Sequence, residues 1–198
     1  QRGSYNVAGV SFTPEEIAQA IARRVPGFRL DCAADFREAI ARGSADAELL
    51  YSGALAHARA GAETEAHVLL DRAQLAPGAD APALRGEILA LRGRLWKDAL
   101  HRVPPGRAAD ELAARARDDY LAAYALARDP YPGINAATLS MLRGDAKTAR
   151  TLAAAVEATL VQRGGLLAGW DLLTAAEAAL LRGNVALARE RYVAAWLE

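Results

Sequence analysis

One spacing of small and larger side chains follows three glycines of this chain and constrains its fold more than any other feature. The fifth residue after each of Gly61, Gly144 and Gly183 is alanine, and the ninth and twelfth residues after each glycine are apolar or aromatic. Two small residues stand eight and seven positions ahead of each glycine. A fourth stretch repeats the last three positions without the glycine. The residues are Gly53, Ala54, Ala66, Leu70 and Ala73; Ala116, Tyr120 and Ala123; Ala136, Ala137, Ala149, Ala153 and Val156; and Ala175, Ala176, Ala188, Tyr192 and Ala195.

This spacing predicts pairs of antiparallel helices. Glycine ends the first helix, because it adopts the left-handed backbone of a helix C-terminus without steric cost. The fifth, ninth and twelfth positions then share one face of the second helix, which packs back on the first. This is the pattern of tetratricopeptide repeats, whose usual period is about 34 residues. Because Ala116, Ala149 and Ala188 are 33 and 39 residues apart, we expect an all-α helical-repeat solenoid with degenerate repeats and connections of unequal length.

Local signals give the expected elements. Thr13-Pro14-Glu15-Glu16 is typical of a capped helix start. Ala76-Pro77-Gly78 and Pro104-Pro105-Gly106 are breaks, and Leu91-Arg92-Gly93 predicts a further turn. Only Tyr5 to Phe12 is a candidate for a strand. The expected helices are Pro14–Val25, Asp31–Arg42, Asp46–Ala60, Ala62–Leu75, Pro82–Leu91, Arg94–Arg102, Ala108–Arg128, Gly133–Arg143, Asp145–Arg163, Ala168–Arg182 and Val185–Leu197.

Composition narrows the classes of function. The 24 Lys and Arg residues equal the 24 Asp and Glu residues, so the basic excess typical of a nucleic-acid-binding protein is missing. No apolar run reaches the roughly 18 residues of a membrane span. With Cys32 as its one cysteine, the chain cannot form an internal disulfide, which suits the cytoplasm. The start, Gln1-Arg2-Gly3-Ser4, lacks an initiator methionine, so we expect a piece of a longer protein.

We expect no catalysis, cofactor or metal in this chain. A phosphate-binding loop, GxGxxG, HExxH and CxxC are missing from the sequence. His57, His67 and His101 do not have metal-ligand spacing. Cys32 is expected to be inert and half-buried. Asp118 and Asp119 are adjacent on a helix, so they point in different directions and cannot act as one carboxylate pair.

Three runs within residues 46–198 are more specific than the repeat. They span residues 91–98, 120–139 and 169–183 and include Gly93-Arg94-Leu95-Trp96-Lys97-Asp98. In this order they resemble the TRAFs-binding domain, the tetratricopeptide-like regulatory region of apoptosis signal-regulating kinases and of bacterial multidomain proteins. Gly169 and Trp96 stand where that family usually has tyrosine. We therefore divide the chain into an N-terminal helical segment of unknown affiliation, residues 1–45, and a TRAFs-binding-type repeat domain, residues 46–198.

The resemblance implies a protein-binding, regulatory scaffold module without catalytic activity. The alanine- and arginine-rich composition is typical of a high-GC bacterial chain, which suggests a larger signalling or defence protein rather than binding of TRAF adaptors. The motifs supply the candidate partner-binding residues. These are Arg94, Lys97, Asp98, Tyr131, Asn135, Trp170 and Asp171.

Each of these motifs also has a structural explanation. Arg94 and Asp98 have the spacing of an ion pair on one helix face. Asn135 can satisfy buried backbone groups at the start of its helix. Tyr131 and Trp170 can fill gaps between repeats.

Three functions remain open. A binding module would hold a protein or peptide in a concave groove lined by residues such as Tyr51, His57, Ser140 and Glu177. An intramolecular regulator would control a neighbouring effector or kinase-like domain and would expose an apolar patch at one end of the array. An enzyme would need a cleft with perturbed titratable groups, and the sequence names none.

Overall fold

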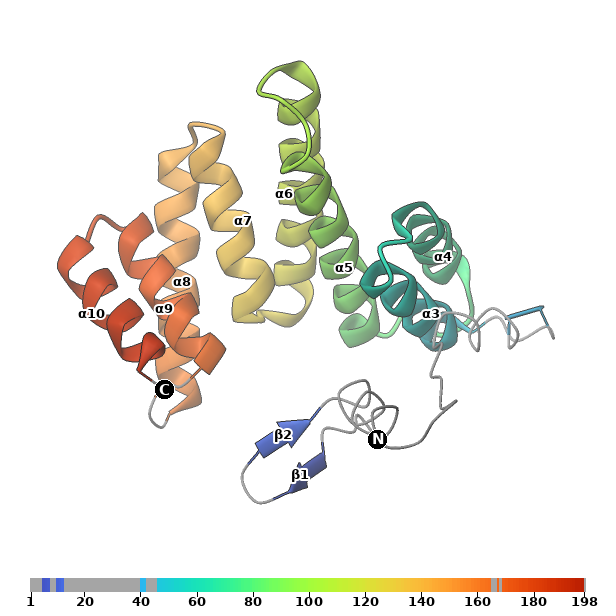
Figure 1. The fold of residues 1–198 in the computed structure, drawn as a ribbon, viewed down its shortest axis with the longest axis horizontal. Coiled ribbons are helices and arrows are strands. Elements are labelled where there is room, and N and C mark those ends of the chain that lie inside the picture. The colour runs from blue at the N-terminus through green and yellow to red at the C-terminus, as the bar shows by residue number, and fades with distance from the viewer. Residues whose placement is uncertain are drawn as a thin grey trace, which may run out of the picture.

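The chain forms an array of helix pairs. The computed structural model describes residues 5–7, 10–12, 40–41, 46–164, 167 and 169–197. Eight helices in this part of the chain form four antiparallel pairs, each packed on the next (Figure 1). The predicted all-α, tetratricopeptide-like repeat fold is therefore confirmed. The pairs are α3 (Ala47–Arg59) with α4 (Glu63–Leu75), α5 (Pro82–Leu100) with α6 (Arg107–Ala127), α7 (Pro130–Leu142) with α8 (Ala146–Arg163), and α9 (Gly169–Leu181) with α10 (Val185–Trp196).

Two short strands precede the array. β1 (Tyr5–Val7) and β2 (Val10–Phe12) pair antiparallel, with Tyr5 opposite Phe12, so the described parts of the stretch expected to be a strand are extended. The predicted helices Pro14–Val25 and Asp31–Arg42 lie outside the described residues, except that residues 40 and 41 are helical. Among the described helices, none is both long and apolar enough to cross a bilayer.

The three repeat glycines end the first helices of their pairs as predicted. Gly61, Gly144 and Gly183 have φ angles of 75°, 82° and 86°, in the left-handed region that favours glycine. The next residue donates its amide to a carbonyl five positions earlier, as in Asp145 N–H to Ser140 O at 2.9 Å. The same bond, also at 2.9 Å, joins Ala62 to His57 and Asn184 to Ala179.

The predicted stripes form a core that runs along the array. In α4, α6 and α8 the fifth, ninth and twelfth positions are all buried. In α10 only the fifth position, Ala188, is buried. Successive clusters of apolar residues join α3, α4 and α5, then α5, α6 and α7, then α6 to α9.

The predicted turn at Leu91-Arg92-Gly93 is wrong, because α5 runs unbroken from Pro82 to Leu100. The two helices expected there, Pro82–Leu91 and Arg94–Arg102, are one helix. Gly93 instead lets α6 lie close: a Cβ at this position would be 3.2 Å from the ring of Tyr120 and 3.3 Å from the carbonyl oxygen of Ala116. The glycine serves helix packing, and the connection follows at residues 101–106, where the predicted Pro104-Pro105-Gly106 break is confirmed.

α7 starts earlier than predicted, at Pro130 instead of Gly133. Asp129 caps it, since its side chain accepts a hydrogen bond from the amide of Tyr131 at 2.8 Å. Gly133 therefore lies inside the first turns of the helix. A Cβ there would be 2.6 Å from Val156 and 2.8 Å from the ring of Tyr124, so this glycine too is needed for close packing.

Candidate protein-binding site

α5 presents three of the candidate residues on one side. Arg94, Lys97 and Asp98 are three and four positions apart, the spacing that brings helical side chains together. The Nε of Arg94 lies 3.5 Å from a carboxylate oxygen of Asp98, which confirms the predicted ion pair. Both side chains are about two-fifths exposed, at 44% and 41%, so solvent weakens this pair and it adds little to stability.

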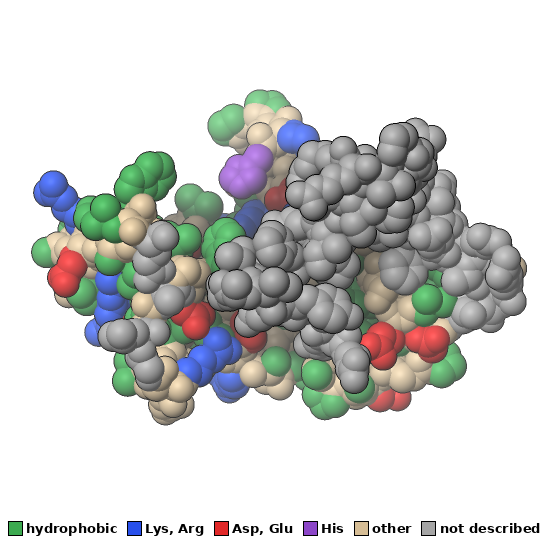
Figure 2. Space-filling model, turned by 60° about the horizontal axis from the view of Figure 1, so that its bottom comes forward, with side chains coloured by type: hydrophobic (Ala, Val, Ile, Leu, Met, Phe, Trp, Pro, Cys, Tyr) green, Lys and Arg blue, Asp and Glu red, His purple; other side chains and the backbone are tan. Residues whose placement is uncertain are grey.

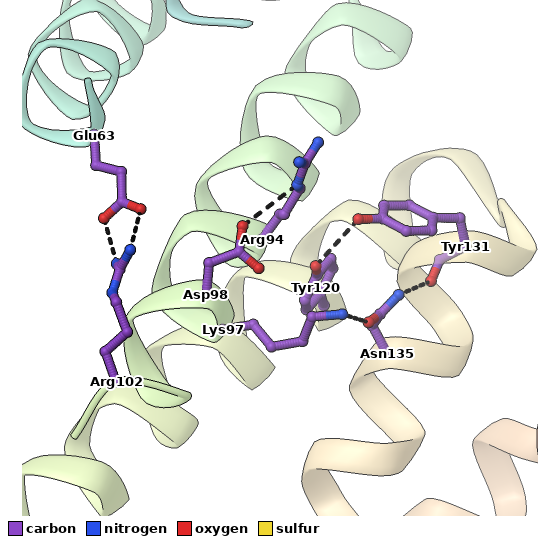
Figure 3. A network of polar contacts seen from close by, with 8 residues as sticks. All are labelled: Glu63, Arg94, Lys97, Asp98, Arg102, Tyr120, Tyr131 and Asn135. Atoms are coloured by element: carbon purple, nitrogen blue, oxygen red, sulfur yellow. Dashed lines mark hydrogen bonds and ion pairs between the residues drawn. The ribbon is translucent and has the colours of Figure 1, made fainter. Parts of the chain in front are cut away.

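Lys97 connects α5 to α7. Its Nζ donates a hydrogen bond to Oδ1 of Asn135 at 2.6 Å, and Nδ2 of Asn135 donates to the backbone carbonyl of Tyr131 at 2.8 Å (Figure 3). The predicted contact of Asn135 with a backbone group at the helix start is therefore present, although that contact is exposed rather than buried. The bond to Lys97 adds a link between two repeats.

Tyr120 of α6 belongs to the same arrangement. Its hydroxyl lies 3.3 Å from that of Tyr131, and the two rings meet edge to face with centroids 5.9 Å apart. The Nζ of Lys97 lies 6.0 Å from the centroid of the Tyr120 ring. We call Arg94, Lys97, Asp98, Tyr120, Tyr131 and Asn135 the Lys97 cluster. Sequence reasoning gave Tyr120 a core position but not this role, because the stripe says nothing about where its hydroxyl lies.

Burial sets the electrostatics of the cluster. Burial lowers the pKa of Lys97, and the Asp98 and Glu177 carboxylates only partly oppose that shift. Lys97 makes no ion pair with any described carboxylate. Burial also raises the pKa of Tyr120 well above its usual range, and the neighbouring Tyr131 hydroxyl adds to this. The cluster therefore contains a partly buried ammonium group, and among the described residues its one hydrogen-bond acceptor is the neutral amide of Asn135.

Glu177 of α9 extends this surface to the fourth pair. It accepts a hydrogen bond from the hydroxyl of Thr138 on α7. Glu177 thus lies on the first helix of the last pair and contacts the first helix of the pair before it, which agrees with the packing of α7 on α9. Thr138 is a neighbour that the sequence did not single out.

Two of the groove residues expected from the sequence are buried, although His57 also lines an apolar pocket with Ile40 and with Val68 of α4. Ser140 is buried and donates to the carbonyl of Ala136 at 2.7 Å, and His57 is buried as well. Both stand four positions before a turn glycine. Ala179 has the same position and is also buried.

Trp170 and Asp171 lie apart from the hydrogen bonds of the Lys97 cluster. They occupy the first turn of α9, and the Trp170 side chain is 84% exposed, so the expectation that it fills a gap between repeats is wrong. In a first turn the side chain leans toward the helix N-terminus, away from the neighbouring helices. Asp171 lies 3.7 Å from Nη1 of Arg163, whose Nη2 lies 3.6 Å from Asp129, the cap of α7.

The adjacent carboxylates Asp118 and Asp119 point apart as predicted, one to Arg117 and the other to Arg92. Within the described part of the chain, no three His, Cys, Asp or Glu residues are grouped so that they could hold a metal ion. Cys32 lies outside the described residues.

Comparison with known proteins agrees with this architecture. The model of a family described as Tetratricopeptide Repeats-Sensor matches residues 29–140, more than half of the chain. The match contains the whole Lys97 cluster but ends before Trp170 and Asp171. A search of curated proteins finds no match.

Proposed function

The chain belongs to the Tetratricopeptide Repeats-Sensor family, and from this premise we propose that the Lys97 cluster is where it receives a segment of a partner protein. Tetratricopeptide-like arrays act in general as protein-binding scaffolds, because stacked helix pairs offer an extended surface. The proposal narrows this general role to one surface, formed by the first helices α5, α7 and α9.

The observation that carries the proposal is the state of Lys97. A half-buried ammonium group has lost part of its hydration, and a neutral amide oxygen repays less of that loss than a carboxylate would. An acceptor oxygen from a bound segment would complete the hydrogen bonds of Nζ. A fully solvated lysine on the surface needs no such acceptor, because water completes its hydrogen bonds.

The neighbours of Lys97 suit the rest of a peptide. Tyr131 is 45% exposed, and its hydroxyl lies 3.3 Å from that of Tyr120, the residue whose ring centroid lies 6.0 Å from the ammonium group. Tyrosine is enriched at protein interfaces because it combines apolar area with a polar end. Arg94 and Asp98 offer one charge of each sign at the rim. We therefore propose a segment that brings a backbone carbonyl or a carboxylate to Lys97 and an apolar side chain to Tyr131.

Site-specific photo-crosslinking tests this proposal. A benzophenone side chain is introduced in place of Tyr131 and, as a control, in place of Leu75, which is 90% exposed at the end of α4. We expect one protein from the native lysate to be crosslinked at position 131 and not at position 75. Crosslinking at both positions, or at neither, contradicts the proposal.

A matched lysine pair checks the role of the ammonium group. Lys97→Met should abolish capture of that protein, whereas Lys147→Met, at the exposed start of α8, should leave it unchanged. Helix content measured by circular dichroism serves as the control for folding. Equal losses in both variants would show that total charge, not this site, governs capture.

We also propose, following the resemblance to the TRAFs-binding domain, that the module works inside a larger bacterial signalling or defence protein in the cytoplasm. There it would regulate a neighbouring effector or kinase-like domain. Exposed apolar side chains on α10 support this second candidate, since a regulator of that kind needs such a patch at one end of its array. Deleting the repeats from the full-length protein should then change effector activity without any partner added.

A further inference from the structure

The helices α6 and α10 carry an aromatic pair at equivalent positions. Aligning Ala116 with Ala188, as the repeat requires, places Tyr120 opposite Tyr192 and Tyr124 opposite Trp196. The two pairs differ in burial. Tyr120 and Tyr124 are 0% and 4% exposed, whereas Tyr192 and Trp196 are 39% and 89% exposed.

The next first helix is what covers the aromatic pair of α6. α7 packs on α6, and Ala136 of α7 shares an apolar cluster with Tyr120. Gly133 allows the closest approach, since a Cβ there would lie 2.8 Å from the Tyr124 ring. Small residues on the covering helix are therefore what lets aromatic side chains lie between two pairs.

The second helices α4 and α8 are also covered by the first helix of the following pair. Each packs on the first helix of the following pair, α5 or α9. The buried ninth position is Leu70 in α4 and Ala153 in α8. Among the second helices of the described array, only α10 has an exposed ninth position.

The uncovered face of α10 is broader than the aromatic pair. Val193 and Leu197 are 53% and 79% exposed. Apolar side chains reach the surface at the left-hand end of the molecule in Figure 2, on the side where Figure 1 draws α9 and α10. Exposed apolar patches of this kind mark surfaces that bind another protein element.

We infer that Tyr192 and Trp196 form the docking face for one more α-helix, which presents glycine and alanine at the point of contact and belongs to the same polypeptide. The repeat itself argues for this occupant. The covering helices α5, α7 and α9 follow α4, α6 and α8 after connections of six, two and five residues. This docking face is separate from the Lys97 cluster, so the inference does not depend on peptide binding there. It does compete with the intramolecular regulator for the same face of α10.

The test supplies such a helix in register. Because Trp196 has the position of Tyr124, a copy of residues 127–143 appended directly after Glu198 continues α10 as α6 continues into α7. All proteins compared carry Trp170→Phe, which removes the other highly exposed tryptophan. We expect acrylamide quenching of Trp196 to fall to that of a buried tryptophan and the Tm to rise by about 5 °C.

The control carries the same extension with Gly133→Leu and Ala136→Leu in the appended copy alone. It has the same length and charge but no small-residue stripe, so it should leave Trp196 as quenchable as in the unextended chain. Equal protection in both extended proteins, or protection in neither, overturns the inference. So does light scattering that finds the unextended 20.9 kDa chain as a dimer with Trp196 already protected, since the occupant would then be a second copy.

Discussion

Lys97 shows how a residue of ordinary type acquires an unusual environment. Its neighbours on α5 are Arg94 and Asp98, which pair with each other, so its amine reaches across to Asn135 on the next pair. Burial lowers the pKa of the amine more than the nearby carboxylates of Asp98 and Glu177 raise it. A lysine on a fully solvated helix face would show no such pKa shift, and its substitution would not impair one particular binding site.

The Tyr120 hydroxyl predicts a change of stability at alkaline pH. Its pKa is raised in the folded chain, so the unfolded chain loses this proton first, near pH 10. The stabilising effect is therefore complete below about pH 10 and is lost as the pH rises above it. Between pH 8 and pH 11 the urea midpoint of the native chain should fall more than that of Tyr120→Phe. Equal falls would mean that Tyr120 does not contribute, because every other titrating group is common to both proteins.

Two helical glycines make a matched test of close packing. Gly133→Ala should destabilise the fold by about 1–3 kcal/mol, because its Cβ would overlap Val156 and the Tyr124 ring. At Gly86 the nearest atoms would lie 3.7 Å from a Cβ, an ordinary contact. Gly86→Ala should therefore be neutral or stabilising by up to about 1 kcal/mol, since alanine is the better helix former. Urea unfolding of both variants measures the difference, and a similar cost at the two sites would refute this explanation.

At the scale of the element, the same tripeptide ends a helix in some places and lies inside a helix in others. Leu-Arg-Gly occurs at residues 84–86, 91–93, 142–144 and 181–183, yet only the last two occurrences end a helix. The next residue distinguishes them. Asp145 and Asn184 each accept a hydrogen bond from an amide three residues on and so cap a new helix. Arg94 cannot cap in this way, so α5 continues, and this signal was available in the sequence.

The turn glycines should tolerate asparagine better than alanine. Gly144 has a φ of 82°, and no atom lies within 4 Å of the point that a Cβ would occupy, so backbone strain is the whole cost of a side chain there. Gly144→Ala should cost about 1–2 kcal/mol and Gly144→Asn less, because asparagine visits the left-handed region more readily. Thermal unfolding compares the two. An alanine variant as stable as the asparagine variant would argue that the turn rearranges.

At the scale of the whole molecule, ion pairs join the helix pairs at separate points. Arg102 binds Glu63 between the first and second pairs (Figure 3). Glu157 of α8 binds Arg182 and Arg191, which belong to the last pair. Burial alone would raise the pKa of Glu157, but the two guanidinium groups outweigh it and hold the pKa below its usual range. This contribution is present above about pH 4.5 and is lost as the pH falls below it.

Glu157→Gln should therefore loosen one end of the array and leave the other intact. In repeat proteins each unit contacts only its neighbours, so a lost contact acts locally. Hydrogen exchange at neutral pH should be faster in α9 and α10 and unchanged in α3 and α4. Glu63→Gln is the control and should show the reverse pattern. A uniform increase along the chain in either variant would indicate one cooperative unit instead.

The sequence by itself determined the class of fold and most helix boundaries. Residues at offsets of five, nine and twelve from a turn glycine fall on one helix face whatever surrounds them, because the period of the α-helix is fixed. The same spacing determined that Ala66, Ala149 and Ala188 would be buried. The ion pair of Arg94 with Asp98 was predictable for the same reason.

Only the tertiary structure decided which distant side chains meet. Lys97 and Asn135 are 38 residues apart, and their contact depends on how closely α5, α6 and α7 pack, which Gly93 and Gly133 control. Burial at Ser140 and exposure at Trp170 likewise depend on which helix covers each position. A local sequence pattern specifies which side chains share one face of a helix. Which helix packs against that face depends on the free energies of contacts between repeats, and the spacing of residues within one helix does not contain that information.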